Sequence, residues 1–388
     1  MSQRIARKVC ARRQPSLLSF RNNKVANPPF SIANPLRTIA AGLSLQPSHD
    51  APSGWLALSA FVGLPLALWA YKVCLGGTIG GPRAIVLSRN VRHSQCLMLI
   101  IFQRKVIYMG RYAPPGSRTE LLADMYPKYT PNGIHIEELS IPSSRPSKVR
   151  LSALLLRRDL SAAPQHVIVY LQGNAGNPLH RIPMFATLLN AIPSLAILAP
   201  APRSYWTSTG ARPTQAGLTA DHAAALAFAA SRFPTSRLTL YGHSLGASAA
   251  LCLLGNDCAP GIGVHGLVLE NAFTSVPDML RALYPQRWLP YRYLGPFVVD
   301  RWDARAAARG IRRRALAHRA MVLVSERDEV VPPVMGQEIF DALKVPSGTD
   351  GRIGRLVVLE RALHEDAWRH RDWSQAMKQY LCDLEGKL

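Results

Sequence analysis

Acidic residues are almost absent from the first third of this 388-residue chain. Residues 1–119 contain sixteen Lys and Arg but a single acid, Asp50, and so carry +15 of the total net charge of +22. The rest of the chain carries only +7, and it contains no zinc-finger spacing, aromatic RNA-binding signature or basic helical stripe. This distribution argues against a nucleic-acid-binding protein, which would concentrate basic residues on its folded domain.

Cysteine is also scarce. The six cysteines form no Cys-x-x-Cys pair, which excludes a disulfide framework and a zinc site and favours a reducing compartment. With 48% hydrophobic and 18% charged residues, the composition is that of a globular protein. It excludes a fully disordered, collagenous or multi-span membrane chain.

Residues 1–54 form a basic N-terminal segment with no acid before Asp50. A basic, Ser-containing and acid-poor start is typical of a mitochondrial transit peptide. A disordered cytosolic tail that lies against anionic lipid has the same composition. Mitochondrial and endomembrane locations therefore both stay open.

A membrane anchor is expected within residues 55–102. Residues 55–71 carry no charge, and as a helix they would span about 26 Å; a buried or re-entrant helix is the alternative. The apolar run 96–102 is too short to span alone. Removing the Gly-rich, basic residues 73–95 would join the two runs into one 25-residue apolar segment. We therefore hypothesise that residues 73–95 are an insertion, such as translated intron sequence.

Beyond the Pro- and Gly-rich residues 112–130, apolar strands alternate with helical stretches. The expected strands are 133–141, 149–156, 166–171, 195–200, 237–241, 266–270, 321–325 and 355–359, of which the first two are a candidate hairpin. The expected helices are 178–190, 214–233, 245–254, 334–343 and 366–384. This alternation predicts a mostly parallel eight-stranded sheet with helices on both faces.

The motif with the clearest chemistry is Gly242-His243-Ser244-Leu245-Gly246. It follows the strand 237–241 and precedes a helix, which is the setting of a strained elbow that presents a serine nucleophile at the carboxyl edge of a sheet. Gly242 and Gly246 are needed because the turn leaves little room for side chains. The first helical N–H groups then lie beside a developing oxyanion.

A nucleophilic serine needs an acid and a base, which in such sheets follow it in the order acid, histidine. Asp328 is the expected acid because it lies just past the strand 321–325, and Glu326 and Glu329 remain alternatives.

His364 is the expected base because a short loop connects it to the strand 355–359 and a helix follows. His370 and His318 fit less well, since His370 would lie inside that helix and His318 before a strand.

The loop 171–177 follows the strand 166–171. Asn177 could cap the next helix with Pro178 at its first position, which leaves Gly173, Asn174 and Gly176 unexplained. A hydrolase supplies its second oxyanion N–H from such a loop. We assign that role to the backbone of Asn174, paired with the N–H of Leu245.

Seven segments resemble a fungal branch of the bud-emergence-type, membrane-anchored α/β-hydrolases. They are QGNAGNPLHR, APRSYWTSTG, LYGHSLGA, LENAFTSVPDML, ALYPQRWLPYRYLGPFVVDRWDA, SERDEVVPP and ALHEDAW. The resemblance starts near Phe102 and implies an α/β-hydrolase domain over residues 103–388, an N-terminal membrane helix and a triad of Ser244, Asp328 and His364. Two departures are Ala247, where many relatives have a second glycine, and the insertion 73–95.

Residues 272–309 are expected to form the lid that such hydrolases carry after the sixth strand. Most of its aromatic residues are expected to pack as a structural cap, and one or two could line an acyl pocket. The roles of Tyr205 and Trp206 stay open. The lid aromatics are Trp288, Tyr291, Tyr293, Phe297 and Trp302.

These features predict a membrane-anchored serine hydrolase that cleaves a carboxylic ester or thioester of a lipid or other acylated small molecule. No metal or organic cofactor is expected. The contrasting hypothesis is a catalytically silent membrane scaffold with the same fold, because fold does not imply function.

Overall fold

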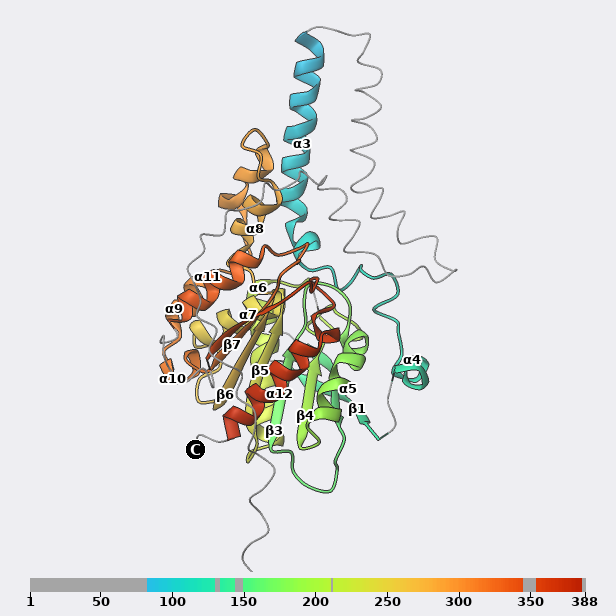
Figure 1. Ribbon diagram of the computed structural model, residues 1–388. Helices are drawn as coiled ribbons and strands as arrows, with labels where there is room; N and C mark the ends of the chain where they lie inside the picture. The colour runs from blue at the N-terminus through green and yellow to red at the C-terminus, as the bar shows by residue number, and fades with distance from the viewer. Residues whose placement is uncertain (1–81, 130–132, 144–148, 211, 345–353, 386–388) are drawn as a thin grey trace, which may run out of the picture.

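The computed structural model describes residues 82–129, 133–143, 149–210, 212–344 and 354–385. Its centre is an eight-stranded sheet with the strand order β1-β2-β4-β3-β5-β6-β7-β8 (Figure 1). β1 and β2 form an antiparallel hairpin, β2 pairs antiparallel with β4, and all other pairs are parallel. The strands are β1 His135–Pro142, β2 Arg150–Arg157, β3 His166–Leu171, β4 Leu195–Pro200, β5 Arg237–His243, β6 Val264–Glu270, β7 Ala320–Ser325 and β8 Arg355–Leu359.

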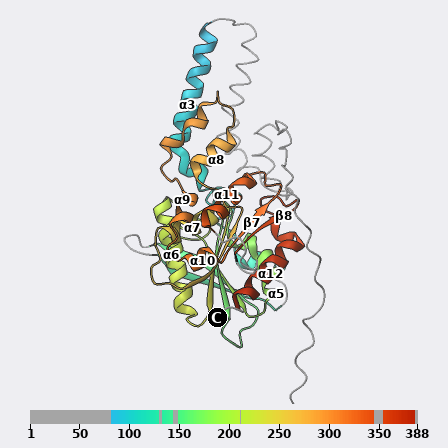
Figure 2. The same cartoon turned by 60° about the vertical axis from the view of Figure 1, so that its left-hand side comes forward.

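Helices cover both faces of the sheet. α5 and α12 pack together on one face, whereas α6, α7, α9 and α11 pack in a continuous group on the other (Figures 1 and 2). β3, β4 and β7 are buried at every position, as expected for parallel strands covered on both sides. The helices are α5 Ile182–Ala191, preceded by a 3-10 turn Pro178–Arg181, α6 Gln215–Arg232, α7 Leu245–Gly255, α9 Ala304–Gly310, α10 Arg314–Ala317, α11 Pro333–Leu343 and α12 Arg371–Glu385.

The expected mostly parallel sheet and its hairpin are confirmed. Three of the predicted strands have the observed bounds, and the others differ by no more than two residues at either end. The helix expected over residues 366–384 is divided into a 3-10 turn, Ala367–Arg369, and α12. His370 therefore lies between these two elements rather than inside a helix.

The N-terminal helix α3, Pro82–Ile107, projects away from the sheet (Figure 1). It joins part of the expected insertion 73–95 to the apolar run 96–102, and the expected domain boundary after residue 102 falls inside it. None of the helices in the described ranges combines the length and apolar character that crossing a bilayer requires. The basic segment 1–54 and the expected anchor 55–71 lie outside the described residues.

A connecting segment, residues 108–121, leads from α3 to the short helix α4, Leu122–Tyr129. Its Met109 N–H donates to the carbonyl of Asn174 at 2.7 Å, and the carbonyl of Ala113 accepts from the Gly176 N–H at 2.8 Å. This segment therefore holds the loop 171–177 from outside the sheet.

The insertion after β6 contains α8, Val276–Leu283, and two 3-10 turns, Pro290–Tyr293 and Gly295–Phe297. Trp302 is fully buried and donates its indole N–H to the Tyr108 hydroxyl at 3.0 Å. By contrast, Trp288, Tyr293 and Phe297 are 66%, 58% and 57% exposed. The packed-cap interpretation is therefore right for Trp302 and wrong for these three side chains, which are more than half exposed.

Candidate active site

The turn around Ser244 has the expected strand-turn-helix geometry. Ser244 connects β5 to α7 with φ 53° and ψ −117°, and its side chain is almost buried. A Cβ at Gly242 would lie 2.4 Å from the Gly246 carbonyl oxygen, and one at Gly246 would lie 2.0 Å from the Leu171 carbonyl oxygen. No real Cβ tolerates such contacts, so both glycines are required for this serine to occupy the carboxyl edge of the sheet.

Asp328 and His364 meet directly across the ends of β7 and β8. His364 Nδ1 and Asp328 Oδ2 are 2.7 Å apart, and the two side chains are 5% and 2% exposed. The other carboxylate oxygen, Oδ1, accepts the N–H groups of Val330 and Val331 at 2.8 and 2.7 Å. These backbone bonds fix the carboxylate so that it can orient the imidazole.

The two alternative acids contact backbone rather than the imidazole. Glu329 Oε2 accepts the backbone N–H of His364 at 3.0 Å, and Glu326 Oε2 accepts that of Arg361 at 2.8 Å. Only Asp328 among the three is therefore placed to orient the His364 ring, while the other two stabilise the loop that carries it.

The environment of His364 favours its protonated form. Burial alone would lower the pKa of the imidazole, but the hydrogen bond and charge of Asp328 outweigh it and raise the pKa above its ordinary value. A base of this kind holds a proton taken from a serine hydroxyl more firmly than an isolated imidazole does.

His243, the residue before Ser244, contacts His364. His243 Nε2 donates to the His364 carbonyl at 3.0 Å, and the two ring centroids are 5.0 Å apart. Within the described ranges no hydrogen bond joins the Ser244 hydroxyl to the His364 imidazole. Catalytic hydrogen bonds are often long in the absence of substrate and shorten when it binds.

The segments that carry the two expected oxyanion donors both lie next to Ser244. Leu245 is the first residue of α7, so its N–H has no partner within the helix. A Cβ at Gly173 would lie 3.6 Å from the Ser244 Cβ, so the loop that carries Asn174 passes directly beside the serine. The Tyr205 hydroxyl donates to the Asn174 carbonyl at 3.1 Å, which gives the buried Tyr205 a supporting role in this loop.

The end of the same loop matches the capping pattern. Asn177 accepts the N–H of Leu179 at 2.9 Å, and Pro178 begins the 3-10 turn. Gly176 has φ +74°, and a Cβ there would lie 2.9 Å from the His180 ring. The loop therefore needs this glycine both for its conformation and for space.

Asn271 contributes to the site although nothing in its sequence motif indicated it. Its side chain exchanges hydrogen bonds with Ser325, accepting the backbone N–H at 2.9 Å and donating to the hydroxyl at 3.0 Å, and it donates to the His364 carbonyl at 3.1 Å. It is buried and has φ 50°. Its position directly after β6, at the same edge as Ser244, was the available signal.

His243, His364 and Glu365 carry ligand atoms within 4.8 Å of one another, close enough to hold a metal ion. Arg181, however, forms an ion pair with Glu365 and lies 3.5 Å from His243 Nδ1. The Glu365 side chain is 58% exposed, and the charge of the Arg181 guanidinium lowers its pKa and neutralises the carboxylate. Because His364 Nδ1 is also committed to Asp328, this chemistry does not suit a metal ion, and we assign none.

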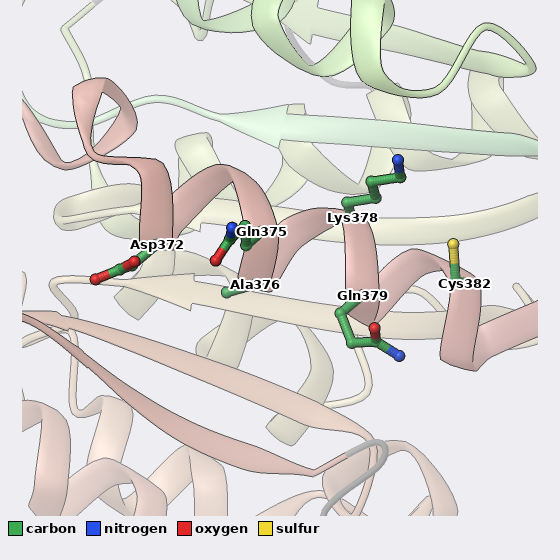
Figure 3. Close-up of a pocket in the computed structure, with 6 residues that line it drawn as sticks. All are labelled: Asp372, Gln375, Ala376, Lys378, Gln379 and Cys382. Carbon is green, nitrogen blue, oxygen red and sulfur yellow. The ribbon is translucent and has the colours of Figure 1, made fainter. Parts of the chain in front are cut away.

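A surface pocket is lined only by residues of α12 (Figure 3). It contains none of the expected site residues, and its side chains point in different directions. We therefore do not assign the substrate to it. Its lining residues are Asp372, Gln375, Ala376, Lys378, Gln379 and Cys382.

No family model matches the chain, but comparison with known proteins finds relatives of similar sequence. Protein bem46 of Schizosaccharomyces pombe is 27% identical over 234 residues, which are 60% of this chain and 72% of that protein. The α/β hydrolase domain-containing protein WAV2 of Arabidopsis thaliana is 28% identical over 285 residues, which are 70% of this chain and 84% of that protein. The lysophosphatidylserine lipase ABHD12 of Danio rerio is 27% identical over 213 residues, which are 53% of each chain.

A solved structure of an alpha-beta hydrolase from Vibrio vulnificus shares the fold. It aligns with a TM-score of 0.52 and 15% sequence identity and covers 74% of this chain and 92% of its own. The resemblance found in the sequence motifs is thus confirmed: the chain is similar to Protein bem46 and to WAV2, and it has the α/β-hydrolase fold.

Proposed function

We propose that this protein is a serine hydrolase that cleaves a carboxylic ester or thioester through Ser244, His364 and Asp328. The observation that carries the proposal is the 2.7 Å contact between His364 Nδ1 and Asp328 Oδ2, at the sheet edge where Ser244 occupies a strained turn. An acid that orients a histidine beside a strained serine is the arrangement that activates a hydroxyl group for acyl transfer.

The proposed reaction proceeds in two halves. Ser244 Oγ attacks the acyl carbon while His364 Nε2 takes its proton, and Asp328 holds the imidazolium. The N–H groups of Asn174 and Leu245 stabilise the tetrahedral oxyanion. His364 then protonates the leaving alcohol or thiol, and a water molecule, activated by the same histidine, releases the acid from Ser244.

The proposed substrate is an acylated lipid or a related acyl ester. The name of ABHD12, a lysophosphatidylserine lipase, supports a lipid ester without fixing the headgroup or chain length. A membrane-anchored enzyme, held by residues 55–71 in a mitochondrial membrane or an endomembrane, would meet such substrates.

Full-length protein should stay with membranes after alkaline carbonate extraction, because carbonate removes electrostatic contacts but not a spanning helix. Recovery in the supernatant would contradict the anchor.

The catalytic proposal is tested with full-length protein in detergent and a series of p-nitrophenyl esters and acyl thioesters of increasing chain length. We expect turnover of at least part of the series and no turnover by Ser244→Ala. If folded protein with a cooperative thermal unfolding transition hydrolyses none of the esters and thioesters, the result would favour the catalytically silent scaffold.

A further inference from the structure

Exposed apolar side chains concentrate on α3 and on the insertion beside it. These two segments hold nine of the sixteen large apolar side chains that are exposed in the described part of the chain. We name this set the α3–cap surface. Its residues are Leu97, Met98, Ile101 and Val106 of α3, and Leu283, Trp288, Tyr293, Phe297 and Val299 of the insertion.

Side chains of α3 contact both the backbone and the side chains of the insertion. Gln103 donates to the Phe297 carbonyl at 3.1 Å and accepts the Val299 N–H at 2.8 Å. Nearer the middle of the helix, the guanidinium of Arg92 lies 5.4 Å from the ring centroid of Trp288. In both views α3 and the insertion with α8 extend side by side from the sheet (Figures 1 and 2). The nine side chains thus belong to one projecting structure.

Positive charge predominates on α3 and the insertion. α3 contains five Arg and Lys and no acid. The acids of the insertion are engaged internally: Asp300 pairs with Arg104 at 2.9 Å, Asp278 pairs with Arg281 and Arg305, and Asp303 caps α9. Among the α3 cations whose side chains the structure describes, Arg92 and Lys105 form no ion pair, so the α3–cap surface combines exposed apolar side chains with positive charge.

We propose that the α3–cap surface lies on the headgroup region of a bilayer that contains anionic phospholipids. Trp and Tyr favour that region because their rings are apolar and their N–H or O–H groups are polar. Anionic headgroups would attract the Arg and Lys of α3. A second copy of this chain fits less well, because it would bring equal positive charge to the contact. The segment 55–71 of this chain is a second alternative occupant of the surface, but it carries no charge and so would not neutralise the basic residues of α3.

This contact would direct lipid to the proposed active site, and in this respect it rests on the proposed function. The insertion follows β6 at the carboxyl edge of the sheet. Two residues after α3 ends, Met109 donates its N–H to Asn174, whose amide is a proposed oxyanion donor. A lipid ester that leaves the bilayer at the α3–cap surface would therefore reach the same edge as Ser244.

The test is photolabelling of full-length protein in vesicles that contain a phosphatidylcholine with a photoactivatable acyl chain, followed by peptide mapping. One set of vesicles contains phosphatidylserine and the other does not. We expect label on peptides that cover residues 97–106 and 283–299, and more label with phosphatidylserine. Because labelling needs no turnover, the same map is expected from Ser244→Ala, so failure of this proposal is distinguishable from failure of the catalytic one.

A matched pair of variants tests the residues. Trp288→Ser, Phe297→Ser and Val299→Ser combined should reduce label on residues 283–299 by roughly tenfold or more, because three exposed apolar contacts are removed. Leu160→Ser, Val334→Ser and Val358→Ser combined remove side chains of similar exposure that lie outside α3 and the insertion. This control should leave the label unchanged.

Three results would overturn the proposal. They are label confined to residues outside the α3–cap surface, equal label in the two triple variants, and chemical crosslinks between copies through residues 97–106 without lipid label. If the first triple variant unfolds, the wild-type map with its two lipid compositions still decides the question.

Discussion

The carboxyl edge of the sheet and the α3–cap surface are neighbours with opposite side-chain chemistry. At the sheet edge the polar groups are buried, and Asn271, His243 and Glu329 each hold part of the His364 backbone. On the α3–cap surface Trp288 and Phe297 are more than half exposed. Buried polar groups with satisfied hydrogen bonds fix a geometry, whereas a concentration of exposed apolar groups indicates an external partner. The carboxyl edge of the sheet is therefore suited to chemistry, and the α3–cap surface is suited to binding.

The largest expected effect comes from the nucleophile at the buried edge. Ser244→Ala should lower esterase turnover by at least ~10⁴-fold, as removal of a triad serine does in other hydrolases. Thermal stability should hardly change, because no core volume is lost. Ser248→Ala is the matched control, since it removes another buried hydroxyl from α7. Equal losses of turnover in the two variants would show that the elbow has no special role.

The second-largest expected loss of turnover distinguishes Asp328, the proposed acid of the triad, from its neighbour Glu329. Asp328→Asn should lower turnover by ~10⁴-fold, because an amide at this position favours the wrong imidazole tautomer. Glu329→Gln keeps an acceptor for the His364 N–H and should lower turnover less than about tenfold. A larger loss in Glu329→Gln would place the acid one position further along the loop.

The pH profile tests the electrostatics of the same edge. Because the pKa of His364 is raised, the neutral base should appear only above its ordinary range, so turnover should rise with pH through a value above 6.5. Any stability gained from the protonated imidazole is present below pH 6.5 and lost as pH rises through the raised pKa. The residual activity of Asp328→Asn should begin at lower pH, and an unchanged profile would contradict the assignment.

A smaller effect is expected at Asn271, which we regard as a positioning residue. Asn271→Gly tolerates the positive φ and removes the hydrogen bonds to Ser325 and His364. We expect kcat to fall about tenfold, in line with the loss of one or two buried hydrogen bonds, while KM stays unchanged. Asp257→Gly, at another positive-φ position with φ 51°, is the control and should change neither constant. A rise in KM alone would argue against positioning of His364.

The smallest effect should occur on the other side of the comparison. The combined substitution of Trp288, Phe297 and Val299 by Ser should change turnover of a short, water-soluble ester by less than about twofold, because these side chains make no contribution to the core. A loss as large as that of Asp328→Asn would show that the two regions are not separable.

The sequence predicts the sheet edge far better than the α3–cap surface. Apolar runs bounded by turns define the strands, and the Gly-rich elbow and loop have few alternative conformations, so Ser244, Asp328 and His364 all fall at strand ends. Asn271 escaped notice because its role depends on contacts across three strands. The exposed state of Trp288 and Phe297 depends on where α3 and the insertion project, which no local pattern specifies.

The central claim, that Ser244 is the reactive nucleophile, is tested most directly by labelling wild-type protein with a fluorophosphonate and mapping the adduct by mass spectrometry. One adduct per chain on Ser244 is expected, with loss of labelling after denaturation, because reactivity depends on the folded arrangement with His364 and Asp328. An adduct on another residue, or none on a folded protein that hydrolyses esters, would contradict the account.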